Sequence, residues 1–84
     1  SFKRRVTIIV NESGDVNAER RAVSEELQRH ALKVSDVGFE CCRKTQRCRM
    51  RFDVRLRDAA ALHALTAALY DRAGVERVSV GRTV

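Results

Sequence analysis

"CRMRFDVRLR", residues 48–57, alternates apolar and charged side chains without a break. Successive side chains of a β-strand point to opposite faces of its sheet, so the stretch predicts a strand with one buried face. The buried set would be Cys48, Met50, Phe52, Val54 and Leu56. The other face would present Arg49, Arg51 and Arg55 to solvent or to a partner.

The residues before this strand predict a strand followed by a helix. "RRVTIIVN" (4–11) is rich in β-branched residues and alternates in the same way. The turn "ESGD" (12–15) follows, and Asp15 is suited to cap a helix that runs from Val16 or Asn17 to His30. The buried stripe of that helix would be formed by Val16, Val23 and Leu27.

A second strand leads directly into residues 48–57. Its inward face would carry Val37, Phe39 and Cys41, and Val34 breaks the alternation, which indicates a β-bulge near Ser35 and Asp36. The four residues "RKTQ" (43–46) would then form the hairpin loop. The matching register places Cys41 opposite Cys48, Phe39 opposite Met50, and Glu40 opposite Arg49.

After Asp58, "AAALHALTAALYDRAG" (59–74) predicts a second helix that ends at Gly74. Its apolar stripe would consist of Leu62, Leu65 and Leu69. "VERVSVGRTV" (75–84) predicts the last strand, with Val78 and Val80 directed inward.

The predicted order is β-α-β-β-α-β over one domain, residues 1–84. Two right-handed crossovers around a central hairpin give an α+β, ferredoxin-like fold. We expect a four-stranded antiparallel sheet with both helices on one face. The strands at 4–11 and 48–57 should lie in its centre, because they carry the strongest apolar faces.

All three cysteines lie within residues 41–48. A zinc site needs about four converging ligands, but alternation divides these sulfurs between the two faces, and His30 and His63 lie on separate helices. Cys41 and Cys48 come near disulfide distance, although opposite Cβ atoms are usually wider apart than a relaxed disulfide prefers. We therefore expect two buried thiols in a reducing compartment.

The excess of basic residues suits an anionic partner, either nucleic acid or an acidic membrane surface, but genome composition is the favoured explanation of the arginine excess. There are 17 basic and 11 acidic residues, a formal net charge of +6. No nucleophile is paired with a base and no glycine-rich phosphate loop is present, so we predict no catalytic, metal-binding or cofactor-binding residues and no enzyme activity. Glu12 and Asp15 would supply at most half of a magnesium site, and a solvated turn is the favoured interpretation.

The basic face of the predicted sheet suggests a second class of function. Ferredoxin-like RNA-binding domains use this face, but they stack bases on aromatic side chains of the central strands. Here Phe39 and Phe52 should point inward. A nucleic-acid-binding module therefore remains as an alternative, with nonspecific, salt-dependent binding rather than recognition of a specific sequence.

The residues also resemble a known family. The pattern of "RRVTIIV", the "ESGD" turn, the "VGFE…RMRFDVRL" hairpin and the closing "AGVERVSV" looks like an ACT-like domain, and more closely like the C-terminal domain of the bacterial MgtC family. The resemblance implies a longer inner-membrane protein with this domain in the cytoplasm. It also implies a regulatory role in adaptation to low magnesium and in survival inside macrophages, exerted through membrane protein partners.

Two departures from the ACT pattern qualify that implication. Amino-acid-binding ACT domains carry a D-x-P-G-like turn, whereas Asp15 is followed by "VNA", so a small-molecule effector is not expected. No carboxylate cluster for Mg²⁺ is present either, so no direct binding of magnesium is expected. ACT domains often pair edge to edge, which makes a homodimer through the edge strands a further hypothesis.

Overall fold

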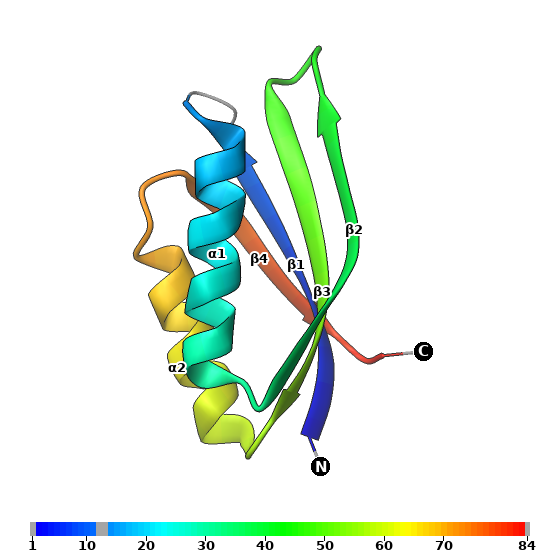
Figure 1. Ribbon diagram of the computed structural model, residues 1–84, viewed down its shortest axis with the longest axis vertical. Helices are drawn as coiled ribbons and strands as arrows, with labels where there is room; N and C mark the ends of the chain where they lie inside the picture. Colours follow the sequence, from blue (N-terminus) through cyan, green and yellow to red (C-terminus); the bar gives the residue numbers. More distant parts are fainter. Residues whose placement is uncertain (1, 12–13, 84) are drawn as a thin grey trace.

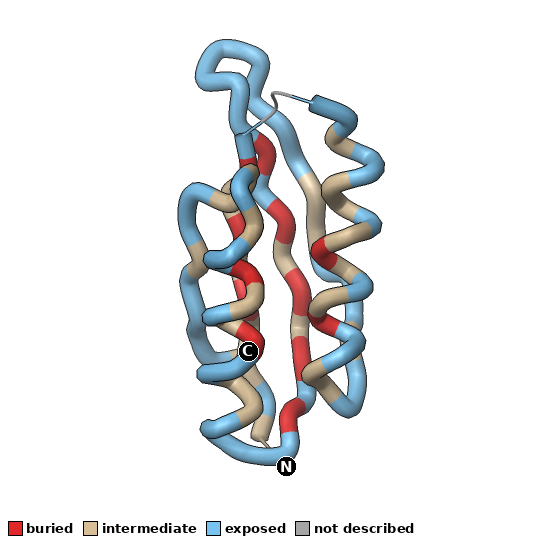
Figure 2. Tube along the Cα trace, turned by 90° about the vertical axis from the view of Figure 1, so that its left-hand side faces the viewer, coloured by how far each residue is buried: buried red, intermediate tan, exposed pale blue. Residues whose placement is uncertain are grey.

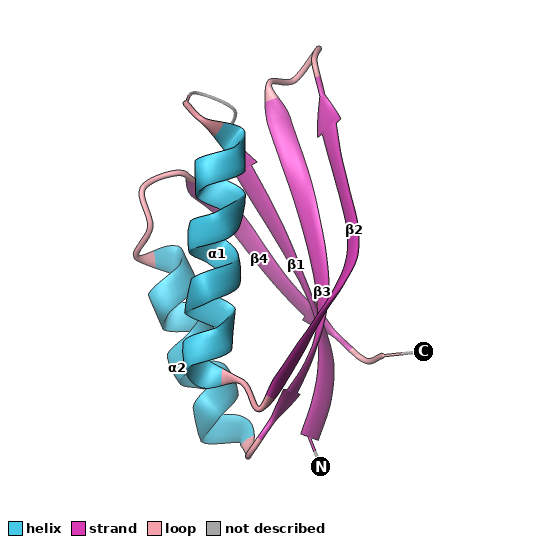
Figure 3. Ribbon diagram, in the orientation of Figure 1, coloured by secondary structure: helices cyan, strands magenta, loops and turns pink. Residues whose placement is uncertain are grey.

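The computed structural model describes residues 2–11 and 14–83. Within them, four strands and two helices follow each other in the predicted order (Figures 1 and 3). The turn predicted at 12–15 lies partly outside the described residues, which do not include Glu12 and Ser13. The elements are β1 Phe2–Asn11, α1 Val16–His30, β2 Lys33–Cys42, β3 Arg47–Leu56, α2 Ala59–Tyr70 and β4 Val75–Gly81.

The four strands form one antiparallel sheet in the order β2-β3-β1-β4. The predicted central position of β1 and β3 is therefore confirmed. Both helices pack on the same face of the sheet, and none of the described residues forms a layer on the opposite face (Figure 1). Each helix begins at an aspartate, since Asp15 accepts hydrogen bonds from the backbone N–H of Asn17 and Ala18, and Asp58 accepts one from Ala61.

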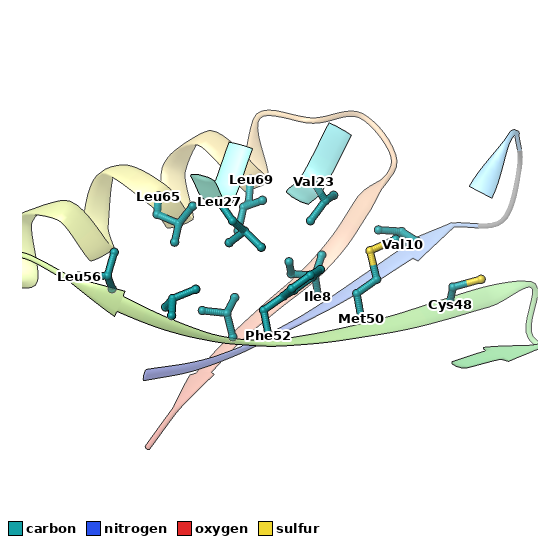
Figure 4. Close-up of a cluster of buried hydrophobic side chains, with 12 residues drawn as sticks. Ile8, Val10, Val23, Leu27, Cys48, Met50, Phe52, Leu56, Leu65 and Leu69 are labelled. Atoms are coloured by element: carbon teal, nitrogen blue, oxygen red, sulfur yellow. The ribbon is translucent and has the colours of Figure 1, made fainter. Parts of the chain in front are cut away.

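The hydrophobic core lies between the sheet and the helices. Figure 2 shows the buried residues on the strands behind the helices and on the side of each helix that faces the sheet. The sides of the helices that face away from the sheet are exposed. Figure 4 shows the side chains of β1 and β3 meeting those of both helices. The core consists of Val6, Ile8, Val10, Val23, Leu27, Cys48, Met50, Phe52, Val54, Leu56, Leu65 and Leu69.

The predicted bulge in β2 is present, but it lies at Val37. The register shifts between Asp36 and Gly38, and Val37 is 40% exposed, so its predicted inward position is wrong. The bulge also brings Asp36 opposite Phe52, on the helix side of the sheet. There Asp36 accepts a hydrogen bond of 2.7 Å from Arg20 of α1, whose guanidinium also lies over the ring of Phe39.

The β2–β3 hairpin has the predicted register and loop. Cys41 lies opposite Cys48, and residues 43–46 form the turn, with Gln46 in the left-handed region. The prediction of two buried thiols is wrong, because Cys41 and Cys48 form a disulfide and Cys41 is exposed. The Cα atoms of the two cysteines are 3.9 Å apart, closer than opposite residues of an antiparallel pair usually lie.

Two details near the C-terminal half also differ from expectation. Helix α2 ends at Tyr70, four residues before Gly74, and Gly74 does not have a positive φ. The helix ends instead where the N–H of Asp71 bonds the carbonyl of Ala67. In β4, Val78 packs against the core as predicted, and Val80 lies opposite Val6 on the same side of the sheet, but it is 41% exposed near the strand's end.

Candidate functional site

The face of the sheet opposite the helices is the candidate site, and we call it the open face. Its residues alternate along each strand with the buried residues of the core. The register places Lys3 beside Arg55, Arg5 beside Asp53 and Thr7 beside Arg51. From the central strands and β4 the open face comprises Lys3, Arg5, Thr7, Ile9, Arg49, Arg51, Asp53, Arg55, Arg77 and Ser79.

In the middle of the open face, Arg5 of β1 binds Asp53 of β3. Its Nε and Nη2 donate hydrogen bonds of 2.8 and 3.1 Å to the two carboxylate oxygens. This bidentate contact lowers the pKa of Asp53 below its ordinary value and raises the pKa of Arg5. The pair is therefore fully ionised at neutral pH, and each charge offsets the other.

Toward the hairpin, the basic residues also have acidic partners. Nε of Arg49 donates a 2.8 Å hydrogen bond to Glu40, and Nη2 contacts the same oxygen. The hydrogen bond from Arg49 lowers the pKa of Glu40 below its usual range, and the positive charge of Arg49 adds to this effect. Arg47 reaches across β1 to Glu76, with Nε 2.6 Å from the carboxylate. Arg49 and Arg47 are therefore offset in this half of the face, whereas Arg77 makes no ion pair among the described residues.

Arg51 lies over the backbone of β2. A Cβ atom added at Gly38 would be 2.8 Å from Nη2 of Arg51, so the missing side chain of Gly38 makes room for this guanidinium. Nε of Arg51 is enclosed and has no hydrogen-bond partner among the residues that the structure describes. Arg51 therefore presents a half-buried positive charge that is not offset by an ion pair in residues 2–11 and 14–83.

At the opposite end, three basic side chains form one row across three strands. Lys33 of β2 lies beside Arg55 of β3, which lies beside Lys3 of β1. None of them forms an ion pair within the described part of the chain. A hollow of about 310 Å³ is lined by this row together with Ser35, Asp53, Val54 and Thr83.

The residues predicted to form a partner face share one side of the sheet but differ in their surroundings, and their contact with a partner stays a prediction. Arg49, Arg51 and Arg55 all lie on the open face of β3, and Arg49 alone is neutralised by a carboxylate. Sequence reasoning did not include Lys33. The bulge at Val37 reverses which side chains of β2 before it face the helices. Lys33 can be placed opposite Arg55, on the open face, only when the position of this bulge is known.

Aromatic rings do not contribute to the described part of the open face. Phe52 is buried in the core and Phe39 packs against it from the helix side. The central positions hold Thr7 and Arg51 instead, so the described residues lack the aromatic rings on which RNA-binding domains stack bases.

Two acidic side chains near the start of α1 already have hydrogen-bond partners. The Asp15 carboxylate caps α1, and Glu19 receives hydrogen bonds of 3.0 and 2.9 Å from Arg72. These bonds raise the pKa of Arg72. Glu12 lies outside the described residues, so the two-carboxylate hypothesis cannot be placed in the structure. Within residues 2–11 and 14–83, no group of three His, Cys, Asp or Glu side chains could hold a metal ion.

Comparison with known proteins supports the fold. No protein-family model and no curated protein sequence matches this chain. Among solved structures, the ACT domain from GTP pyrophosphokinase of Chlorobium tepidum is similar, with a TM-score of 0.66 at 14% identity over 94% of this chain and 96% of that one. The chain therefore has an ACT-like, α+β fold.

Two other solved structures share this architecture. An uncharacterised protein from Thermotoga maritima has a TM-score of 0.64 at 17% identity, covering 93% of this chain and 91% of its own. The de novo designed protein Foldit4 has a TM-score of 0.60 at 15% identity, covering 98% and 97%. Since natural and designed sequences both adopt it, this architecture alone does not specify a function. No helix in the described part of the chain is long and apolar enough to span a bilayer.

Proposed function

We propose that this chain is a noncatalytic regulatory or interaction domain that contacts its partners through the open face. The observation that carries the proposal is that none of the described residues forms a second layer on this side of the sheet, while Arg51 and Arg55 lie there and make no ion pair within that part of the chain. An unoffset basic surface favours association with an acidic partner surface. The similar ACT domain is likewise a domain of a larger protein, GTP pyrophosphokinase.

The proposal includes a setting, which rests on the sequence resemblance. The domain would be the cytoplasmic C-terminal domain of an MgtC-like protein of the bacterial inner membrane. There it would support adaptation to low magnesium and survival in macrophages through contacts with membrane proteins, without transporting or binding Mg²⁺. The basic residues 3–5 suit the cytoplasmic flank of a membrane segment. Pairing of two copies through the edge strands β2 or β4 is part of the same proposal.

Charge reversal on the open face tests this function. We expect Arg51→Glu in the full-length protein to abolish growth of the bacterium at limiting magnesium, because it places a negative charge in the contact surface. The matched control is Arg21→Glu on the exposed side of α1, which changes the net charge equally and should leave growth intact. Circular dichroism of both variants checks folding. Normal growth with a folded Arg51→Glu variant would exclude the open face as the contact surface.

Nonspecific binding of nucleic acid is the second candidate, and the net charge of +6 favours it. Retention of the chain on immobilised RNA or DNA that falls steeply with salt would support this candidate. Absence of retention at low salt would reject it.

A further inference from the structure

We propose that the end of the open face formed by Lys3, Lys33 and Arg55 is a binding site for a phosphate-bearing anion. Lys33, Arg55 and Lys3 are direct neighbours in the register of β2, β3 and β1, so three positive charges lie in one row. The inference rests on the proposed function because it uses the same face, and it adds the chemical class of a ligand.

The charge of this row is not cancelled locally. Asp53 is the acidic residue in the lining of the hollow, and both of its oxygens accept hydrogen bonds from Arg5. The Arg5–Asp53 pair therefore adds no net charge. Across the described residues, neither lysine of the row nor Arg55 makes an ion pair. A ligand would supply the negative charge that the chain does not.

The shape of the site favours a group with several oxygens. Neighbouring strands lie about 4.8 Å apart, so the row spans roughly 10 Å. A guanidinium can bind two phosphate oxygens at once, while each lysine contributes a point charge. The hydroxyl-bearing residues Ser35 and Thr83 line the same hollow. A single carboxylate would offset one of three charges, whereas a diphosphate can engage all of them.

The volume is consistent with this ligand class. The hollow of about 310 Å³ lies at the lower end of the range typical of small-molecule sites. Apart from Thr83, which follows β4, its lining residues belong to strands, so the three basic side chains start from fixed positions on the sheet. A phosphate group of this kind could belong to a free ligand or to a lipid headgroup.

Pyrophosphate is the probe for this site. In an amide-resolved NMR titration of the 84-residue chain, we expect saturable shifts at Lys3, Lys33, Ser35 and Arg55 that exceed those in NaCl at matched ionic strength. Arg55→Gln should weaken binding about tenfold, the loss expected for one charge-assisted contact. The matched control is Arg49→Gln, which removes the same charge from the same face of β3, at a residue already bound to Glu40.

Vesicles distinguish the two sources of phosphate. Cosedimentation with phosphatidylglycerol vesicles, but not with phosphatidylcholine vesicles, that is lost in Arg55→Gln would assign the site to a lipid headgroup. Pyrophosphate binding without vesicle binding would assign it to a free phosphate ligand. Shifts no larger than in NaCl together with no vesicle binding would overturn the inference, as would equal weakening by Arg55→Gln and Arg49→Gln. These binding results need no partner protein, so they are independent of the growth result for Arg51→Glu.

Discussion

Asp53 affects how charge is distributed over the open face. Its carboxylate lies at the centre of β3 and could neutralise any nearby cation, but Arg5 occupies both oxygens. The geometry leaves Arg55 and Lys3, at the next position along both strands, without that carboxylate. Because Asp53 pairs with Arg5, the positive charges of Arg55 and Lys3 are not offset by this carboxylate.

The Arg5–Asp53 pair predicts a pH dependence of stability. The pKa of Asp53 is lowered in the folded state, so the stabilisation is present above the unfolded pKa of about 4 and is lost as the pH falls through the lower folded value. Since the side chain is about one-third exposed, we expect only about 0.5 kcal/mol at neutral pH.

Urea unfolding of Asp53→Asn and of the unchanged chain measures this contribution. The difference in free energy of unfolding should shrink as the pH falls from 7 to 2.5, because progressive protonation of Asp53 in the unchanged chain removes the same charge that the substitution removes. A difference that stays constant over this pH range would show that the ion pair does not stabilise the fold.

At the scale of elements, β3 was predictable and β2 was only partly so. The unbroken alternation of residues 48–57 predicted the buried face of β3. Placing apolar residues opposite apolar residues, and Glu40 opposite Arg49, predicted the register of the hairpin from Phe39 to Cys48. A bulge was also predictable, because Val34 breaks the alternation. Its position was not, since Val34 and Val37 are chemically identical and only the packing of α1 against Asp36 distinguishes them.

Matched valine substitutions test the position of the bulge. Val37→Thr should change the free energy of unfolding by less than about 0.5 kcal/mol, because Val37 is exposed. Val54→Thr makes the same chemical change at a side chain only 2% exposed in the core, so it should cost about 1–3 kcal/mol. Chemical denaturation of both variants provides the comparison, and equal losses would place Val37 in the core, as the alternation alone predicted.

The other differences arise from contacts that local pattern does not contain. The disulfide depends on how closely β2 and β3 approach at Cys41, and the end of α2 depends on a turn at residues 71–74 rather than on the glycine. The Glu19–Arg72 contact joins residues 53 positions apart, because α1 packs beside α2. Cross-strand and interhelical contacts of this kind require the tertiary structure.

At the scale of the whole molecule, the fold buries one face of its sheet and leaves the other bare. All core residues lie between the sheet and the helices, and a chain of this size has modest stability in reserve. Because a designed protein shares the architecture, the features relevant to function are the residues placed on it. Here we propose that those features are the cations of the open face that make no ion pair in the described residues.

The domain is proposed to act through contacts of this face without binding Mg²⁺ itself. An amide-resolved NMR titration with MgCl₂, compared with NaCl at matched ionic strength, tests that claim most directly. We predict that the two salts produce the same shifts along the chain. Saturable, Mg²⁺-specific shifts confined to residues 11–15 would contradict it and identify the domain as a direct magnesium sensor.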